Sequence, residues 1–167
     1  MKYHIDSEKI SLNDLRKRIE NTDLVPSRMT LLDEIGTKFK ALNKTGIKSL
    51  GDLRYELKNA KRLQALVEKS GIDKEYLTLL RREIEGYFPK PIPLKKFHWL
   101  PPDEIEKLEQ QSIGKVAALY ETTRTTKDIT ELKKSSNVDE SILEILMVLA
   151  DLTRIQWVSP LAARMIM

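Results

Sequence analysis

Lysine and arginine side chains gather between residues 36 and 62, and they are the residues of this sequence best suited to bind a charged partner. The window holds eight basic residues against two acidic ones, Asp52 and Glu56, in a chain of net charge +4. Such a local excess of positive charge attracts polyanions, of which a nucleic-acid backbone is one. The same charges also suit the solvated face of an ordinary helix. The eight basic residues are Lys38, Lys40, Lys44, Lys48, Arg54, Lys58, Lys61 and Arg62.

Catalytic and metal-binding chemistry has little support in the residue types. The chain has no cysteine, and its two histidines, His4 and His98, lie far apart in the sequence. No glycine-rich phosphate-binding motif is present, and no nucleophile is accompanied by a base and an orienting group. Paired acids such as Asp103–Glu104 fall where helices are expected to begin, where they favour the helix dipole. We therefore expect no enzyme, no metal, no cofactor and no small-molecule substrate.

The apolar residues that must position these charges recur at helical spacing, and the pattern itself recurs 66 residues later. Leu50, Leu53 and Leu57 follow the spacing of three and four that places side chains on one helix face. The stretch GIKSLGDL from Gly46 matches SIGKVAAL from Ser112. At the same offset, SGIDKEYLTLL matches SNVDESILEIL further along the chain. The sequence therefore predicts an all-α fold with two similar modules.

A proline-rich join, YFPKPIPLKKF, separates the two predicted modules, because its three prolines block helix and favour an extended segment. The last predicted hairpin lacks its second helix, so either the native chain continues beyond Met167, the alternative we favour, or the apolar face of Ala162, Met165 and Ile166 is covered by another unit or another chain. The predicted order is an N-terminal arm and helix over 1–23, a first module over 24–87, a second module over 88–150 with the join at 88–96, and the start of an incomplete third hairpin over 151–167.

Residues that begin and end helices occupy matching places in the two modules. Asp73 and its counterpart Asp139 are expected N-caps, and Ser11 is the expected N-cap of the first helix. Gly46 is expected just beyond a helix end in the left-handed conformation that glycine favours. In the second module Ser112 and the nearby Gly114 would have to share that role.

The stretch EIGTKFKALNKTGIKSLGDLR, from Glu34 to Arg54, resembles a helix-hairpin-helix. From about residue 11 onward, the chain resembles a bacterial and archaeal domain family of unknown function that is built from tandem, divergent helix-hairpin-helix units. The middle and final hairpins of that family are similar to KKFHWLPPDEIEKL and DLTRIQWVSPLAARM. The resemblance implies an elongated array of such modules.

The resemblance also implies a way of binding phosphate, through hairpin glycines whose amides approach the anion at a helix N-terminus. Trp99 and Trp157 occupy the place of the first hairpin glycine, in the stretches FHWLPP and IQWVSP. In the first module that place falls on Glu34 or, shifted by one residue, on Asp33. Only the first module keeps a hairpin glycine amid basic residues. The candidate phosphate-binding residues are Gly36, Thr37, Lys38, Lys40, Lys44, Lys48 and Arg54.

Two functions remain open from the sequence. The protein either binds DNA or RNA without sequence preference through the first module, or it is an adaptor for another protein. In the adaptor, the hairpins serve only packing and Trp99 or Trp157 anchors the partner, although both tryptophans also suit packing between modules. The longest apolar stretch, residues 142–150, is too short for a bilayer, so we expect no membrane association. The polar N-terminus and the absence of cysteine suit the cytoplasm.

Overall fold

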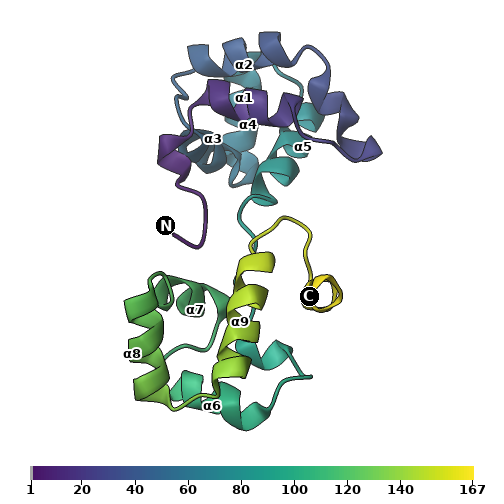
Figure 1. The fold of residues 1–167 in the computed structure, drawn as a ribbon. Coiled ribbons are helices and arrows are strands. Elements are labelled where there is room, and N and C mark those ends of the chain that lie inside the picture. Colours follow the sequence, from purple (N-terminus) through teal and green to yellow (C-terminus); the bar gives the residue numbers. More distant parts are fainter. Residues whose placement is uncertain (1) are drawn as a thin grey trace. The chain divides into compact units, whose positions relative to one another are not determined.

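The computed structural model describes residues 2–167, and the regular elements in that range are all helices (Figure 1). The predicted all-α class is confirmed. Strand-like pairing takes the form of two isolated backbone bridges, Ser11 with Ser49 and Pro93 with Lys115. Within residues 2–167, no helix has the length and apolar character needed to cross a membrane.

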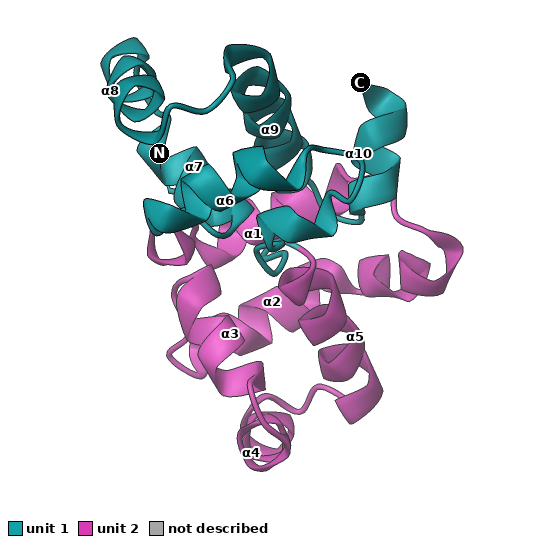
Figure 2. Ribbon diagram, turned by 90° about the horizontal axis from the view of Figure 1, so that it is seen from below, with its two compact units in different colours: residues 1–5, 87–167 teal, residues 6–86 magenta. Residues whose placement is uncertain are grey.

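The chain divides into two compact units, which Figure 2 colours separately. Unit 2 is one continuous segment, residues 6–86, whereas unit 1 combines residues 87–167 with the N-terminal residues up to Ile5. This division differs from the expected one at both ends of the chain. Residues 6–23 belong to the same unit as 24–86, and residues 151–167 belong to the same unit as 88–150, because both segments bury apolar side chains there.

Unit 2 is a helical bundle whose core is made of leucine and isoleucine with Phe39 and Tyr76. Leu15, Leu42, Leu53 and Leu77 come from four different helices and are fully buried, so each contributes about 2 kcal/mol of hydrophobic free energy relative to exposure. Its elements are η1 (Ser7–Lys9), α1 (Leu12–Glu20), η2 (Pro26–Leu32), α2 (Ile35–Lys44), α3 (Leu50–Leu57), α4 (Ala60–Ser70) and α5 (Lys74–Glu85).

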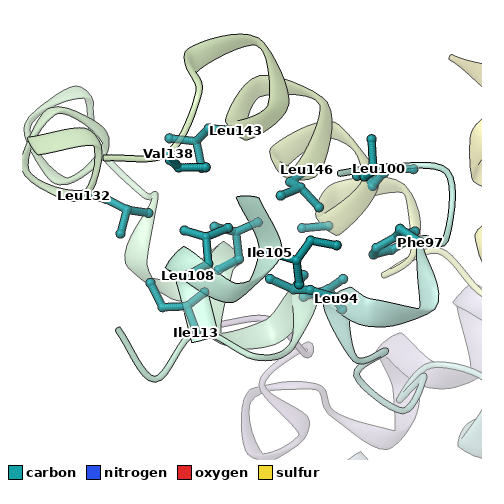
Figure 3. Packing of buried hydrophobic residues seen from close by; sticks show 14 of the residues in the cluster. Leu94, Phe97, Leu100, Ile105, Leu108, Ile113, Leu132, Val138, Leu143 and Leu146 are labelled. Carbon is teal, nitrogen blue, oxygen red and sulfur yellow. The ribbon is translucent and has the colours of Figure 1, made fainter. Parts of the chain in front are cut away.

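Unit 1 is built around α9, which packs against both α7 and α10 (Figure 1). Its core cluster gathers side chains from almost every element of the unit (Figure 3). Phe97 is its largest fully buried side chain, and Ala163 ties α10 to it. The elements are η3 (Leu94–Lys96), α6 (Pro102–Gln110), α7 (Val116–Thr122), α8 (Thr126–Ser136), α9 (Glu140–Leu152) and α10 (Pro160–Ile166).

The N-terminal residues of unit 1 are held by the other end of its sequence. Tyr3 is only 3% exposed, and its hydroxyl donates to the Thr153 carbonyl oxygen at 3.3 Å. The Arg154 Nε donates in turn to the Tyr3 carbonyl oxygen at 3.1 Å. Arg154 also donates to the Tyr120 hydroxyl at 2.6 Å and lies over the Tyr120 ring. Burial raises the pKa of the Tyr3 hydroxyl. This segment is therefore part of the fold of unit 1.

Helix boundaries in the two units follow the 66-residue offset of the sequence. α4 and α8 begin and end 66 residues apart, α3 and α7 begin 66 residues apart, and so do α5 and α9. The bridge residues Ser49 and Lys115, which precede α3 and α7, keep the same offset. The bridge partners do not, because α1 and η2 lie between Ser11 and α2, while η3 alone is assigned between Pro93 and α6. Among the residues that the structure describes, unit 2 thus has a helix, α1, with no counterpart in unit 1.

The caps expected from the sequence are confirmed. Asp73 caps α5 by accepting from the Tyr76 amide at 2.7 Å, and Asp139 caps α9. Ser11 caps α1 through the Asp14 amide. Gly46 has φ 96°, as expected just past α2. The sharing expected between Ser112 and Gly114 is wrong, since Ser112 alone adopts the left-handed conformation, with φ 64°.

Candidate functional site

A groove of about 420 Å³ runs between α1 and α2 of unit 2 and holds part of the predicted basic cluster. Leu12 of α1 and Phe39 of α2 are buried beneath it, so the same apolar stripe that joins the two helices forms its floor. Polar and basic side chains rise on both sides because they occupy the helix positions next to that stripe. The groove is lined by Leu12, Asn13, Arg16, Gly36, Phe39, Lys40, Asn43 and Lys44.

Three cationic side chains line this groove and no acidic side chain does. Lys40 and Lys44 are exposed and lie one helical turn apart on α2. Arg16 faces them from α1, where its Nη2 donates to Asn13 Oδ1 at 3.2 Å and its Nη1 lies 3.8 Å from Glu20 Oε1. The two lysines form no ion pair within the described residues, so their charge is available to an anionic partner.

Gly36 lines the groove as the second residue of α2, and because it has no side chain, it leaves room for Arg16. A Cβ atom at this position would lie 3.5 Å from Arg16 Nη1. That distance is ordinary van der Waals contact, so alanine fits but a longer side chain would meet the guanidinium. Gly36 therefore lets Arg16 approach α2 closely, which brings the third positive charge to the groove.

The other predicted phosphate-binding residues do not line the groove. Lys38 turns away, because its Nζ donates to the Asp33 carbonyl oxygen at 2.8 Å and lies 4.0 Å from the centroid of the Tyr76 ring. Thr37 is exposed on α2. Lys48 lies beyond the end of α2, where its Nζ donates to Asn43 Oδ1 at 3.2 Å. The predicted cluster is thus spread over several faces of unit 2.

Arg54, another member of the predicted phosphate-binding set, is already paired with a carboxylate. Its Nε and Nη2 donate to the two carboxylate oxygens of Glu85 at 2.8 Å and 3.1 Å. The Arg54 guanidinium holds the pKa of the Glu85 carboxyl below its usual range. This bidentate pair joins α3 to α5 and neutralises the charge of Arg54.

The backbone before α2 has the conformation that a hairpin glycine favours, although the residue is a glutamate. Glu34 has φ 51° in the left-handed region and is the N-cap of α2, where its side chain makes no capping hydrogen bond. Trp157 has φ 71°, also left-handed, whereas Trp99 is not among the residues with positive φ. Since side chains other than glycine are strained in this region, Glu34 and Trp157 hold it at a cost of about 1 kcal/mol each.

The two tryptophans have different environments. Trp99 is half-buried against the core cluster of unit 1, with its ring edge-on to Phe97 at a centroid distance of 5.5 Å. The Arg164 guanidinium lies 5.0 Å from the centroid of the Trp99 ring. Trp157, by contrast, is 70% exposed. Trp99 therefore packs within its own unit, and only Trp157 presents its indole to solvent.

The acidic groups of unit 2 whose pKa values are shifted stabilise its helices by capping and ion pairing. The Asp52 carboxylate accepts from the Lys48 and Ser49 amides, both at 2.9 Å, and these hydrogen bonds lower its pKa. Together with the Ser49 hydroxyl, Asp52 forms a capping box that starts α3. Among the described residues, no group of three or more histidine, cysteine, aspartate or glutamate side chains is placed to hold a metal ion.

The groove also contains residues that the sequence reasoning missed, namely Arg16, Asn13 and Asn43. Asn13 and Arg16 are three residues apart on one face of α1, next to the buried Leu12 and Leu15. This spacing predicts a polar face on a helix, but it does not say which helix that face will meet. Only the packing of α1 on α2 brings Arg16 to Lys40 and Lys44.

Comparison with known proteins gives no family and no fold neighbour: no family model, curated protein or solved structure matches this chain.

Proposed function

We propose that this protein binds the phosphate backbone of nucleic acid without sequence preference, through the groove between α1 and α2 of unit 2. The observation that carries the proposal is the set of three cationic side chains, Arg16, Lys40 and Lys44, in one groove lined by no acidic side chain. Asn13 and Asn43 add neutral hydrogen-bond donors on the same walls. Phosphate contacts of this kind position a nucleic acid and read no sequence.

The comparison between the two units supports placing this function in unit 2 alone. At the 66-residue offset, Gly36 corresponds to Pro102, Lys40 to Glu106 and Lys44 to Gln110. Unit 1 therefore replaces the first-turn amide by a proline, one lysine by an acid and the other by a neutral side chain. It also lacks a counterpart of α1, which supplies Arg16 in unit 2.

The helix boundaries also favour treating each unit as a divergent helix-hairpin-helix module, as the sequence resemblance implies. The left-handed Glu34 directly before α2 supports the register in which Glu34, Ile35 and Gly36 form the hairpin. The acidic side chain of Glu34 opposes an anion at the helix N-terminus, so the lysines further along α2 carry the binding in this proposal.

The salt dependence of binding tests the proposal quantitatively. Three neutralised phosphates give a slope of about −2.7 for the logarithm of the duplex association constant against the logarithm of the salt concentration. Between 50 and 200 mM salt the affinity is then expected to fall about 40-fold. Fluorescence anisotropy with a labelled DNA duplex measures both quantities.

A double variant and a matched control locate the interface. Lys40→Gln with Lys44→Gln leaves Arg16 alone, so the affinity is expected to fall only about 3.5-fold over the same salt range, from a weaker starting value. Lys9→Gln with Lys17→Gln removes the same charge from exposed positions of unit 2 that do not line the groove. An equal loss in both variants, or no duplex binding by the native chain at 50 mM salt, would reject the groove as the interface.

A protein-binding role for unit 1 is the second candidate, and the exposure of Trp157 favours it. Its indole is 70% exposed, and Ile155 and Leu161 beside it in the sequence are 54% and 62% exposed. Large apolar side chains at such exposure are typical anchors for a protein partner. Binding through them should change little with salt, in contrast to binding through the groove. Affinity capture with native chain and with Trp157→Ser, each at low and high salt, separates the two candidates.

A further inference from the structure

Tyr55 on α3 is an exposed aromatic residue in the basic part of unit 2, and a guanidinium already stacks on it. The residue is 55% exposed, and the Arg62 guanidinium carbon lies 3.6 Å from the centroid of its ring. Arg62 comes from the first turn of α4, where the Asn59 side chain caps the helix by accepting from the Arg62 amide. The stacking fixes the plane of the Tyr55 ring and covers one of its two faces.

Two hollows meet at Tyr55. One, of about 590 Å³, is lined by Tyr55 together with Arg54, Lys58 and Arg81. The other, of about 310 Å³, is lined by Tyr55 together with Thr45, Gly46 and Lys69. Tyr55 is the residue that both hollows share, so its ring stands on the rim between them.

Consecutive residues at the end of α2 link the second hollow to the groove proposed to hold phosphate. Lys44, at the end of α2, lines the groove, and the next two residues, Thr45 and Gly46, line the hollow beside Tyr55. Lys48 joins the same region through its hydrogen bond to Asn43. The end of α2 thus connects the groove with the hollow beside Tyr55.

The charges around Tyr55 also permit a polyanion to approach. Acidic residues line both hollows: Glu8 and Glu85 line the first, and Asp52 and Glu56 line the second. Glu85 is engaged by the bidentate contact with Arg54, and Asp52 accepts from the Lys48 and Ser49 amides. Lys58 and Lys69 are exposed on either side of Tyr55. With Arg54, Lys58 and Arg81 against Glu8 and Glu85, the first hollow has a net charge of +1, whereas the second, with Lys69 against Asp52 and Glu56, has −1. An incoming strand therefore meets positive charge on the side of the first hollow and at Arg62, which stacks on the Tyr55 ring.

From these observations we infer that Tyr55, stacked on Arg62, is a platform for an unpaired base, so that unit 2 binds single-stranded nucleic acid more tightly than duplex. The inference rests on the proposed phosphate binding in the α1–α2 groove. An aromatic face accepts any base, and a guanidinium on its other side adds a cation–π contribution. A base within a duplex is already stacked on its neighbours, so it gains nothing from Tyr55.

The test is anisotropy with a labelled oligothymidylate of about 12 nucleotides, a length within the range that such surfaces cover. Tyr55→Leu is expected to weaken single-strand binding by roughly 5- to 150-fold, the loss that follows from removing one stacked base. Its duplex affinity should stay unchanged, and Tyr55→Phe should restore single-strand binding because it keeps the ring. Trp157→Leu, which removes an exposed aromatic residue from unit 1, is the matched control and should leave single-strand binding intact.

Each result separates this inference from the proposed function. If Tyr55→Leu keeps full single-strand affinity while Lys40→Gln with Lys44→Gln still loses duplex binding, the stacking platform is refuted and the phosphate groove stands. Equal losses on single strand and duplex, or no rescue by Tyr55→Phe, also refute stacking. If the native chain binds neither probe at 50 mM salt, the proposed function itself fails. Circular dichroism of each variant checks that the helices remain folded.

Discussion

Two glutamates on α5 form ion pairs that differ chiefly in burial, and they should respond very differently to the same substitution. Glu83 is 3% exposed, and its Oε2 lies 3.3 Å from Nη1 of Arg28 in η2. Glu85, two residues later, pairs with Arg54 at 2.8 Å in an exposed site. The exposed fractions of the paired side chains are 12% and 4% for Arg28 and Glu83, but 40% and 47% for Arg54 and Glu85.

The expected magnitudes follow from that difference. Glu83→Ala leaves the Arg28 charge in a buried site without its carboxylate, which is expected to cost about 3 to 5 kcal/mol of unfolding free energy. Glu85→Ala breaks a pair in which water already surrounds both groups, so its cost should be about 0.2 to 1 kcal/mol. A domain of this size has only about 4 to 12 kcal/mol in total, so Glu83→Ala removes a large share of the stability of unit 2.

Urea unfolding can assign the loss to one unit because both tryptophans lie in unit 1. Circular dichroism follows the helices of both units, whereas tryptophan fluorescence follows unit 1. Glu83→Ala should lower the dichroism midpoint of unit 2 by about 1.5 to 3 M urea, and Glu85→Ala by less than 1 M. Arg28→Met with Glu83→Leu should recover most of the loss, because no unpaired charge then remains buried. Similar midpoints for the two single alanine variants would refute this reasoning about burial.

Three further predictions follow from the backbone and from the pKa shifts. Gly46→Ala should lower the unfolding free energy by about 1 to 2 kcal/mol in urea titrations, because φ there is 96°, whereas Gly114→Ala should cost less than about 0.5 kcal/mol. Glu34→Gly should raise duplex affinity about 2- to 5-fold in the anisotropy assay, since it removes a negative charge at the start of α2 and keeps the left-handed backbone; an unchanged affinity would place the bound phosphates away from this hairpin. The pKa values of Asp52 and Glu85 are lowered in the folded chain, so the stability they contribute is present above about pH 4.3 and is lost as the pH falls through their folded-state values. Urea midpoints measured between pH 7 and pH 2.5 should fall in that acidic window, and Asp52→Asn should make the fall shallower.

The sequence predicts local features of this fold well because they depend on neighbouring residues. The helical class, the N-caps at Asp73 and Asp139 and the left-handed Gly46 all follow from short-range chemistry. The split between the two units, at Gly86 and Tyr87, lies beside the proline-rich join of the sequence. The left-handed turn at Ser112 is predicted only in part. Because glycine adopts this conformation more readily than serine, the sequence divides the role between Ser112 and Gly114, whereas the structure gives it to Ser112.

Features that depend on which helices meet could not be predicted in the same way. Basic residues are indeed concentrated between positions 36 and 62, but not all of their side chains face the groove. Lys38 contacts Tyr76 and Arg54 pairs with Glu85, and both of these partners lie on α5. Arg16 enters the groove from α1, outside the window altogether. Charge counted along a sequence therefore locates the unit that could bind an anion, while packing between helices decides which charges share one surface.

The position of Tyr3 has a consequence for how the chain is made. Unit 2 is a continuous segment, so all of its contacts are available once residue 86 has left the ribosome. Unit 1 must wait, because the partners of Tyr3 are Thr153 and Arg154, about 150 residues later. During synthesis the N-terminal residues therefore stay without their final contacts until Thr153 and Arg154 have been made. In topology, unit 2 is an insertion between the first residues of unit 1 and the rest of it.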